Sequence, residues 1–478
     1  MLKRCFRKIT LLFIVFCMPL LVCGQNLEKM MQKGDDFYYG KNGETQDYAE
    51  AVKWFRKAAE KGHAEAQCRL GLMCHTGSGL EKDDAEAAKW FRMAAEQGHV
   101  IAQSQLAALF MCGDGVNKDY TEAVRWYRSA AVQGNAYSQD MMGICYMSGS
   151  GVEEDYAKAF QWFLKAANQG YANSQYELGN FYERGMGVKV NMAEAFRWFR
   201  KAAEQGHMKA QFALTFCYSK GNGVEQNYTE AFKWAFRASK QGHRKAPSFL
   251  GLCYKHALGV AQDYTKAFEY FKISAERGDP HGQNELAICY KDGIGVAKDY
   301  GEANKWFLKS AEQGNEAAEF NLGQSYRNGI GVEQNYTEAV NWFRKSAEHE
   351  FSEAQYLLGI SYEYGEGVTQ NFEDALNFYR KAAAKGHVVA MYRIGNLYYS
   401  GKGVDVSYGD AMEWYRKSAE NGNPHAQYSL AVCYDMGRGT KRNVKKAVEW
   451  LRKAVEQGHA DATQLLGELL KENPSLAK

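Results

Sequence analysis

The chain has 478 residues and nearly balanced charge, with 59 Lys and Arg against 56 Asp and Glu. The positive excess lies in residues 1–24, which hold four basic residues and no acidic one. The near-neutral remainder excludes a general polyanion-binding protein, whose affinity comes from a surplus of Lys and Arg. Five prolines and 46% hydrophobic residues argue against a disordered chain.

The first 24 residues have the pattern of a secretory signal peptide. A basic segment at residues 3–8 precedes an apolar run of 14 residues at 9–22, which is shorter than the roughly 20 residues of a membrane-spanning helix. Cleavage after residues 1–24 predicts a mature chain that starts at Gln25 and is exported to the periplasm or the cell exterior. In an alternative, Cys23 is the lipidated first residue of a lipoprotein, although the residue before it suits that signal poorly.

One period of 36 residues runs through the rest of the chain. Trp occurs only at positions that differ by 36 or a multiple of it, and Tyr270 and Phe378 fill the two missing places. Twelve units cover residues 27–458, and a period of this length is typical of a solenoid. We therefore predict an all-α solenoid of about twelve 36-residue helix-turn-helix repeats over residues 25–458. The tryptophans are Trp54, Trp90, Trp126, Trp162, Trp198, Trp234, Trp306, Trp342, Trp414 and Trp450.

Each unit predicts two helices joined by turns that contain glycine. The second helix begins after an Asp, Asn or Ser such as Asp83, whose short side chain can accept an N–H of the first turn. It ends before a Gly that can adopt the left-handed conformation, and only Glu350 breaks this series. The first helix carries the pattern A-x-x-x-L-G-x-x-Y, in which small residues let neighbouring helices approach closely. Thr215 is the bulkiest exception.

The two ends of the array depart from this pattern. The first unit has Gly34 and Asp35 in place of L-G and Lys41 in place of the first loop glycine, although the 36-residue spacing continues without insertion or deletion. We expect this unit to be a frayed cap. At the other end, residues 459–478 are predicted to form a capping helix and tail with polar residues toward solvent.

Eight cysteines follow the predicted cleavage point, and five share one repeat position, where they are expected to be small buried hydrophobes. The other three, Cys68, Cys74 and Cys112, leave two disulfide pairings open in an oxidising compartment. These pairings are Cys74–Cys112 and Cys68–Cys74, of which the second is disfavoured because six helical residues rise about 9 Å. The five cysteines that share a position are Cys145, Cys217, Cys253, Cys289 and Cys433.

The sequence contains no pattern typical of an active site. Six histidines follow a helix-ending glycine, at least one repeat apart, and no H-E-x-x-H motif is present. The G-x-G loops recur with the repeat and are interpreted as helix–helix turns, not phosphate-binding loops. The one S-x-x-K pattern, Ser475 to Lys478, is interpreted as chance. We therefore predict no catalytic residues, no metal site and no cofactor.

The first-helix pattern, the G-x-G-V loop at Gly185 to Val188 and the second-helix pattern A-x-x-W-F-R-K-A-A-E-Q resemble the Sel-1-like repeat. This repeat is a 36-residue relative of the tetratricopeptide repeat, and the resemblance covers residues 27–458. It implies antiparallel helix pairs stacked into a right-handed superhelix that scaffolds protein complexes. Cysteine-rich bacterial members are associated with β-lactam binding or hydrolysis, but their regular cysteine spacing is absent here.

The resemblance places the first helices on the concave side, where residue types vary most between repeats. An aromatic side chain recurs at the position of residue 68, and such a row could hold a peptide or a glycan. In an alternative, the row packs against the next repeat. Lys255, Lys291 and Arg327 predict a basic strip, and Asn180 is expected to bind a peptide backbone. The predicted aromatic binding residues are Tyr176, Phe212, Phe320, Tyr356, Tyr392 and Tyr428.

The sequence therefore predicts an exported protein–protein interaction scaffold that binds a protein or peptide partner, binds no nucleic acid and has no membrane span. Two alternatives stay open, a β-lactam-binding or hydrolysing enzyme and a quality-control adapter in a eukaryotic secretory lumen. Asn227 and Asn335 each begin an N-x-T glycosylation pattern, although their place at helix starts already explains them. The sequence leaves open the partner, the binding face and self-association.

Overall fold

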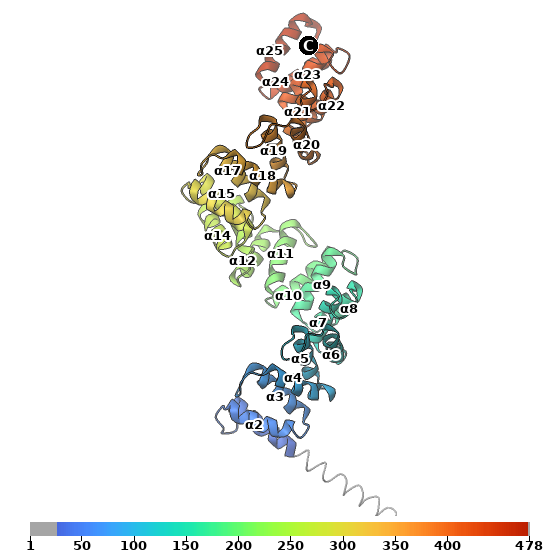
Figure 1. Ribbon diagram of the computed structural model, residues 1–478, viewed down its shortest axis with the longest axis vertical. Helices are drawn as coiled ribbons and strands as arrows, with labels where there is room; N and C mark the ends of the chain where they lie inside the picture. Colours follow the sequence, from blue (N-terminus) through green and yellow to red (C-terminus); the bar gives the residue numbers. More distant parts are fainter. Residues whose placement is uncertain (1–25, 477–478) are drawn as a thin grey trace, which may run out of the picture. The chain divides into compact units, whose positions relative to one another are not determined.

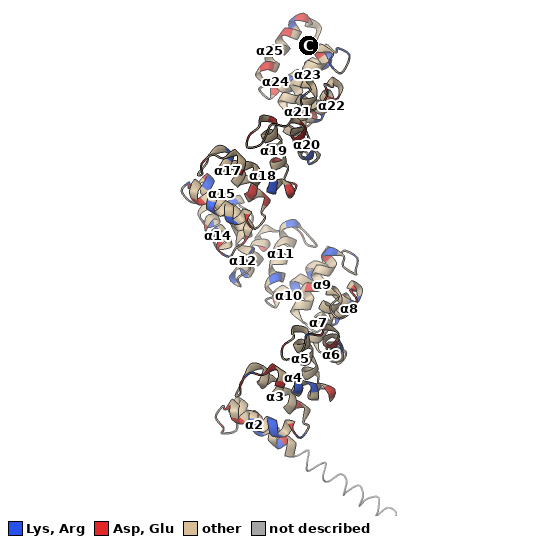
Figure 2. Cartoon of the chain, viewed as in Figure 1, with Lys and Arg blue, Asp and Glu red and all other residues tan. Residues whose placement is uncertain are grey.

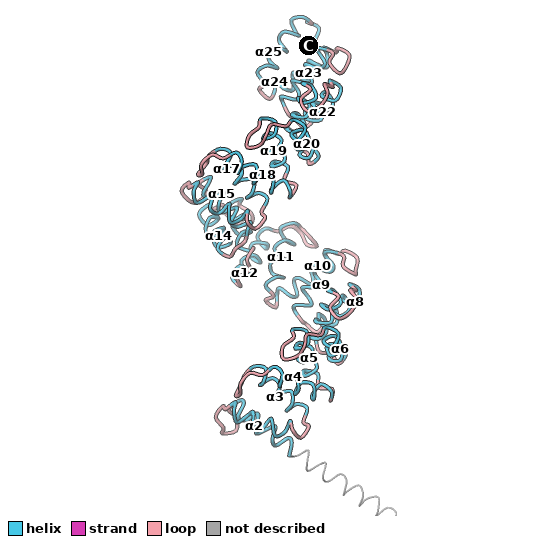
Figure 3. Tube along the Cα trace, in the orientation of Figure 1, coloured by secondary structure: helices cyan, strands magenta, loops and turns pink. Residues whose placement is uncertain are grey.

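The computed structural model describes residues 26–476, so the predicted signal peptide lies outside the described residues. Figure 1 shows the helices in chain order, and Figure 3 shows that helices and loops alone make up the described part of the chain. The chain divides into two compact units, one through Ala238 and one from Ser239. The predicted all-α solenoid of helix pairs is confirmed.

The first unit opens with a helix over residues 26–39, which is the first helix of the first repeat. In most later repeats, the first helix packs most extensively against the second helix that follows it. The other helices of this unit are α2 (Tyr48–Ala59), α3 (Ala64–Thr76), α4 (Asp84–Glu96), α5 (Val100–Cys112), α6 (Tyr120–Val132), α7 (Ala136–Ser148), α8 (Tyr156–Asn168), α9 (Ala172–Arg184), α10 (Met192–Glu204), α11 (Met208–Lys220) and most of α12 (Tyr228–Lys240).

The second unit continues the same alternation of first and second helices. It ends with α25 at the predicted place of the capping helix, followed by the 3₁₀ turn η1, whose Leu476 carbonyl accepts a hydrogen bond from Arg452 at 2.8 Å. Its elements are α13 (Ala246–His256), α14 (Tyr264–Glu276), α15 (Pro280–Asp292), α16 (Tyr300–Ala311), α17 (Glu316–Asn328), α18 (Tyr336–Glu348), α19 (Ser352–Tyr364), α20 (Phe372–Ala384), α21 (Val388–Ser400), α22 (Tyr408–Glu420), α23 (Pro424–Met436), α24 (Val444–Glu456), α25 (Ala460–Glu472) and η1 (Pro474–Leu476).

The helix starts are fixed by side-chain caps, as predicted for the second helices. In α4, the Asp83 carboxylate accepts a hydrogen bond from the Glu86 backbone N–H at 2.9 Å. Histidines cap five first helices, because the ring Nδ1 accepts the backbone N–H three residues on, at 3.1–3.3 Å. The five are His63, His99, His207, His387 and His459. This role explains why histidine recurs directly after the helix-ending glycine.

Acid weakens these histidine caps, because a protonated imidazole carries N–H groups on both nitrogens and cannot accept a bond. Burial lowers the pKa of His207 and of His387, so the folded chain favours their neutral form. The stabilisation is complete above the pKa of an unfolded histidine, about 6.5, and is lost as pH falls through the lower folded values.

Most repeats are closed by a large ring on the second helix that packs against a small residue on the first. Phe91 is fully buried, and a Cβ added to Gly71 would lie 2.7 Å from its ring. Thr215 fits because the ring position of its repeat holds Ala235 instead, and both residues are fully buried. The corresponding Cβ-to-ring distance is 2.3–2.7 Å at Gly34, Gly71, Gly143, Gly179, Gly251, Gly323, Gly359 and Gly395.

A row of glutamine pairs, the Gln ladder, joins consecutive repeats. The buried Gln139 donates to the Ala131 carbonyl at 3.0 Å and accepts from the amide of the exposed Gln169 at 2.7 Å. The bond to Ala131 lies in the interior, where an unpaired polar group costs about 1–3 kcal/mol. The same pair of bonds forms at Gln67, Gln103, Gln139, Gln175, Gln283 and Gln427.

The loop between the two helices of the first repeat is one residue longer than in the other repeats. The constant 36-residue spacing of the sequence does not indicate this difference. The Asp47 N–H donates to the Phe37 carbonyl ten residues earlier, whereas the Asp83 N–H in the next repeat donates to Cys74, nine residues earlier. Gly34 therefore faces the Phe55 ring, as the L-G glycine does in other repeats. From the sequence, we expected Gly34 and Asp35 to take the places of Leu and Gly in the L-G pair. This expectation is wrong, because the helix is shifted by one residue and Gly34 takes the place of the glycine.

All eight cysteines of residues 26–476 are free thiols, so neither of the two open disulfide pairings is present. The five that share a repeat position are buried, as predicted. Burial raises the pKa of Cys217, Cys253 and Cys289 to about 12, which keeps these thiols protonated and unreactive at neutral pH. In the same residues, none of the helices is both long and apolar enough to cross a membrane.

Replacing Ala257 with Gly is expected to stabilise the second unit. Ala257 ends α13 in the left-handed conformation, at φ 57°, where the equivalent residue of every other repeat in this unit is Gly. The substitution relieves about 1–2 kcal/mol of left-handed strain. This gain exceeds the cost of the extra entropy that a glycine gives the unfolded chain, which is about 0.4–1 kcal/mol. Urea unfolding should show a higher midpoint with an unchanged slope. Ala257→Ser, which keeps the strain, should show no gain.

Candidate functional site

The six predicted aromatic binding residues are half-buried. Ring contacts with the next repeat are formed by Tyr176, Phe320, Tyr356, Tyr392 and Tyr428. The Tyr356 ring stacks on the capping His387 of the next first helix at 4.4 Å, and it lies 5.8 Å from the Tyr379 ring. Tyr176 and Tyr428 also contact the histidine caps of their next repeats, each at 4.9 Å. These contacts inside the fold reduce the ring surface that is available to a ligand.

Two of the three cations in the predicted basic strip are paired with carboxylates. Lys and Arg are interspersed with Asp and Glu in both units (Figure 2). Lys255 Nζ lies 2.9 Å from Glu285, and Arg327 Nη2 lies 2.9 Å from Glu366. Lys291 is half-buried and has no ion-pair partner within the described chain.

Asn180, the predicted peptide-binding amide, is also engaged within the fold. Its Nδ2 donates to Glu177 Oε2 at 3.1 Å. Burial raises the pKa of the Glu177 carboxyl, and the nearby Asp140 carboxylate adds to this increase. A peptide that bound here would have to displace or share the amide's bond to Glu177.

Two of the predicted residues, Arg327 and Tyr356, meet at a pocket of about 330 Å³ in the second unit. It is open to solvent and lies across α17, α19 and α21. Leu357 and Ile360 supply its apolar surface, and Tyr364 at the end of α19 is 55% exposed at its edge. The remaining lining residues are Glu366 and Arg393. We refer to this site as the Arg393 pocket.

Arg393 is held at one end by two acceptors of the preceding repeat. Its Nη1 donates to the Tyr364 hydroxyl at 3.0 Å and lies 3.6 Å from Glu363 Oε1. The Tyr379 hydroxyl donates to the other oxygen of Glu363. Burial by itself lowers the Arg393 pKa, but the bond to Tyr364 and the charge of Glu363 outweigh it and leave the pKa above its usual value. Arg393 is therefore a permanent cation at the pocket.

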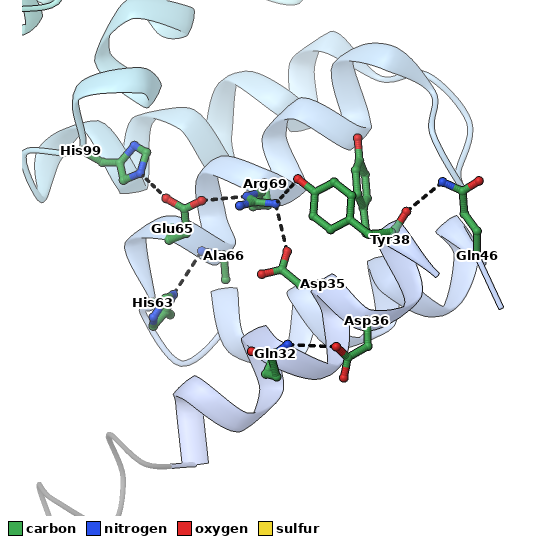
Figure 4. A network of polar contacts seen from close by, with 11 residues as sticks. Gln32, Asp35, Asp36, Tyr38, Gln46, His63, Glu65, Ala66, Arg69 and His99 are labelled. Carbon is green, nitrogen blue, oxygen red and sulfur yellow. Dashed lines mark hydrogen bonds and ion pairs between the residues drawn. The ribbon is translucent and has the colours of Figure 1, made fainter. Parts of the chain in front are cut away.

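A second pocket, of about 380 Å³, lies in the first unit and contains the arginine that occupies the same repeat position as Arg393. Figure 4 shows this Arg69 between two carboxylates, with Nε 2.7 Å from Glu65 and Nη1 3.0 Å from Asp35. Arg69 Nη1 also reaches the Tyr39 hydroxyl at 3.4 Å. Burial raises the Glu65 pKa, but the bonds from Arg69 and His99 outweigh it and hold the pKa below its usual value. Other lining residues are Tyr38, Phe55, Cys68, Leu72, Met73, Thr76 and Ile101.

Both pockets offer hydrogen-bonding groups around an apolar floor, which suits binding. Within residues 26–476, no three His, Cys, Asp or Glu side chains come together in a way that could hold a metal ion. The buried cysteines have raised pKa values and make poor nucleophiles.

Comparison with known proteins decides the family. A family model described as Sel1 repeat matches twelve segments of the chain. The chain belongs to the Sel1 repeat family. The segments are residues 37–63, 64–99, 100–135, 136–171, 172–207, 209–243, 248–279, 280–315, 316–351, 352–387, 388–423 and 424–459.

Solved structures agree with this assignment. The chain is similar to c5321, a protective antigen present in uropathogenic Escherichia coli strains, with 36% identity and a TM-score of 0.75 over 88% of this chain and 90% of that one. It is also similar to a Sel1 repeat protein from Oxalobacter formigenes, with 33% identity and a TM-score of 0.51 over 65% of this chain and 90% of that one. No curated protein matches the chain.

The Sel1 repeat solenoid is a scaffold fold that is commonly used for protein–protein interaction, and proteins of this family are typically not enzymes. Sequence reasoning missed Arg393 and Tyr364 as site residues. The signal was present, since Arg occupies its position in only two Sel1 repeats of this chain, at Arg69 and Arg393.

Proposed function

We propose that this protein is an exported scaffold that binds a protein or peptide partner along the first helices of its second unit. The observation that carries this proposal is the Arg393 pocket, which joins apolar surface, exposed aromatic edges and charged groups across three consecutive first helices. A partner side chain can bury apolar area there and form hydrogen bonds at the rim, as hot spots of interfaces do.

Export is supported by the basic and apolar pattern of residues 1–24. The similar Escherichia coli protein is a protective antigen, and an antigen that antibodies can reach fits a chain outside the cytoplasm. The chain's periplasmic or extracellular placement is therefore part of the proposal.

Replacing Tyr364 with Ser is expected to weaken partner capture by at least about tenfold. The exposed Tyr364 ring borders the pocket, and two other repeats carry Ser at the same position, Ser148 and Ser400. The substitution should therefore leave the fold intact. The measurement is affinity capture from envelope extract with residues 25–478, quantified against the unsubstituted chain.

The matched control is Tyr264→Ser, which removes a tyrosine that is 48% exposed at the start of a second helix. Its capture should equal that of the unsubstituted chain. Equal capture by Tyr364→Ser and Tyr264→Ser would show that the partner binds elsewhere on the repeat surface.

A further inference from the structure

The first unit contains a carboxylate whose two oxygens are both held by groups of neighbouring repeats. Glu65 Oε1 accepts a hydrogen bond from Arg69 Nε at 2.7 Å, and Glu65 Oε2 lies 2.8 Å from His99 Nε2 (Figure 4). The His99 Nδ1 accepts the backbone N–H of Ala102, so its hydrogen is on Nε2 and is donated to Glu65. Arg69 and His99 together form a two-donor cradle for one carboxylate.

The same two donor positions recur nine repeats later in the second unit. Arg393 stands at the position of Arg69, and Asn423 stands at that of His99. The local geometry is conserved between the two sites, because both arginines use Nη1 to reach a tyrosine hydroxyl at the end of the preceding first helix. His99 and Asn423 have the same cap conformation, with φ −65° and ψ 111° against φ −70° and ψ 115°.

The carboxylate itself is missing from the second site, since Val389 takes the place of Glu65. As a result, Arg393 Nε is buried and has no hydrogen-bond partner. Asn423 uses its Oδ1 to accept the Ala426 N–H at 3.0 Å, which leaves the Nδ2 donors directed away from the helix end. Val389 is 39% exposed, so the space beside it is accessible from solvent.

We propose that Arg393 Nε and Asn423 Nδ2 bind a carboxylate of the partner beside Val389, next to the Arg393 pocket, in the place that Glu65 occupies in the first unit. The carboxylate is an acidic side chain or the C-terminal group of a peptide. This inference rests on the proposed function and names a chemical group of the partner that is recognised beside that pocket. An arginine forms strong, charge-assisted hydrogen bonds to a carboxylate, and the amide of Asn423 can donate to its second oxygen.

The charges near the site permit a bound anion. Arg69 is paired with two carboxylates at once, Glu65 and Asp35, which shows that this repeat position tolerates two acidic groups. The ion pair of Arg393 within the described chain is with Glu363, at 3.6 Å. The other nearby acid, Glu366, is already neutralised by Arg327. A partner carboxylate would therefore give Arg393 two neighbouring carboxylates, as Arg69 has.

The amide of Asn423 is shorter than the imidazole of His99. A bound carboxylate consequently lies closer to the α23 backbone than Glu65 lies to α5. An untethered ligand can adopt this position, and a glutamate at position 389 can reach it through a rotamer that differs from that of Glu65.

The test measures the Arg393 Nε–H signal in ¹⁵N-correlated NMR spectra of the mature chain, assigned by its loss in Arg393→Lys. The probes are three capped tripeptides: acetyl-Gly-Glu-Gly-amide, acetyl-Gly-Gln-Gly-amide and acetyl-Gly-Ala-Gly with a free C-terminus. A single carboxylate contact should give a dissociation constant of about 1 mM, which corresponds to about −4 kcal/mol. We expect a saturable shift with one or both carboxylate probes and none with the Gln peptide.

Val389→Glu provides the internal control, because it supplies the missing carboxylate from within the chain. Its Arg393 Nε–H signal should move toward that of Arg69 without any peptide, and peptide affinity should fall by at least about tenfold. The Glu peptide and the free C-terminus distinguish the two sources of the carboxylate. Absence of any shift up to about 10 mM of either carboxylate probe, or equal shifts with the Gln peptide, would overturn the proposal.

The two proposals fail in different ways. If partner capture depends on Tyr364 while the Nε–H signal ignores all three peptides, the scaffold function stands and the carboxylate site is rejected. If the signal responds to carboxylate but capture is unaffected by Tyr364→Ser, the carboxylate site stands and the proposed partner surface is rejected.

Discussion

Ala235→Phe is expected to destabilise the last repeat of the first unit by about 3 kcal/mol, at the upper end of the usual overpacking range. The Phe would place a ring against Thr215. In eight other repeats this first-helix position is Gly, and even an added Cβ there would lie 2.3–2.7 Å from the ring. Thr215 and Ala235 are both fully buried, so neither side chain can turn outward. The contact between α11 and α12 must therefore open.

The double variant Thr215→Gly/Ala235→Phe should recover most of this loss, because it recreates the pair found at Gly179 and Phe199. Repeat arrays need not unfold in one step, so hydrogen exchange of the α11 and α12 amides is the direct measurement. Thr215→Gly alone serves as the control and should lose stability through a cavity. If the double variant is no better than Ala235→Phe alone, the two positions do not compensate each other.

The sequence determined the repeat architecture because each helix boundary depends on local groups. The Asp83 cap and the glycines after each helix are read from neighbouring residues. The sequence did not indicate the shift in the first repeat, because the spacing of the glycines stays constant although the first helix is displaced by one residue. It became visible only through the hydrogen bond of Asp47 to Phe37.

The site was harder to predict because its groups are paired across repeats. Arg327 looked like part of a basic strip, but Glu366 neutralises it from a position 39 residues later. That pairing depends on how the loop after α19 turns back, which no periodicity encodes. Tyr356 stands at a position where residue types vary between repeats, but its stacking on His387 depends on which residue begins the next helix.

The Gln ladder is interrupted at one junction by an acid. Glu319 takes the place of a ladder Gln and is 3% exposed, and its Oε2 has no hydrogen-bond partner. A carboxylate cannot donate to the Ala311 carbonyl, which a Gln at this position would do. His349 replaces the second glutamine of the pair, with its Nε2 4.0 Å from Glu319. The next residue, Glu350, carries a left-handed φ of 59° where the other helix ends have Gly. Three changes therefore coincide at one junction.

Glu319→Gln is accordingly expected to stabilise the second unit by about 1–3 kcal/mol at neutral pH, the range for an unsatisfied buried polar group. Burial raises the Glu319 pKa, while His349 and Lys345 lower it and Glu316 and Glu348 raise it by smaller amounts. A carboxyl whose folded pKa is raised stabilises fully below its unfolded pKa and loses this contribution as pH rises through the folded value.

The advantage of Glu319→Gln should therefore vanish near pH 4, where the protonated acid can donate to Ala311 as an amide does, and grow as pH rises from there toward neutrality. Urea midpoints of the chain with and without the substitution, measured from pH 4 to pH 8, test this. The comparison is repeated in a His349→Gln background, so that titration of the histidine cannot produce the trend. A difference that is independent of pH in that background would show that the pKa of Glu319 is the same in the folded and the unfolded chain. In that case, the interruption of the ladder would carry no electrostatic penalty.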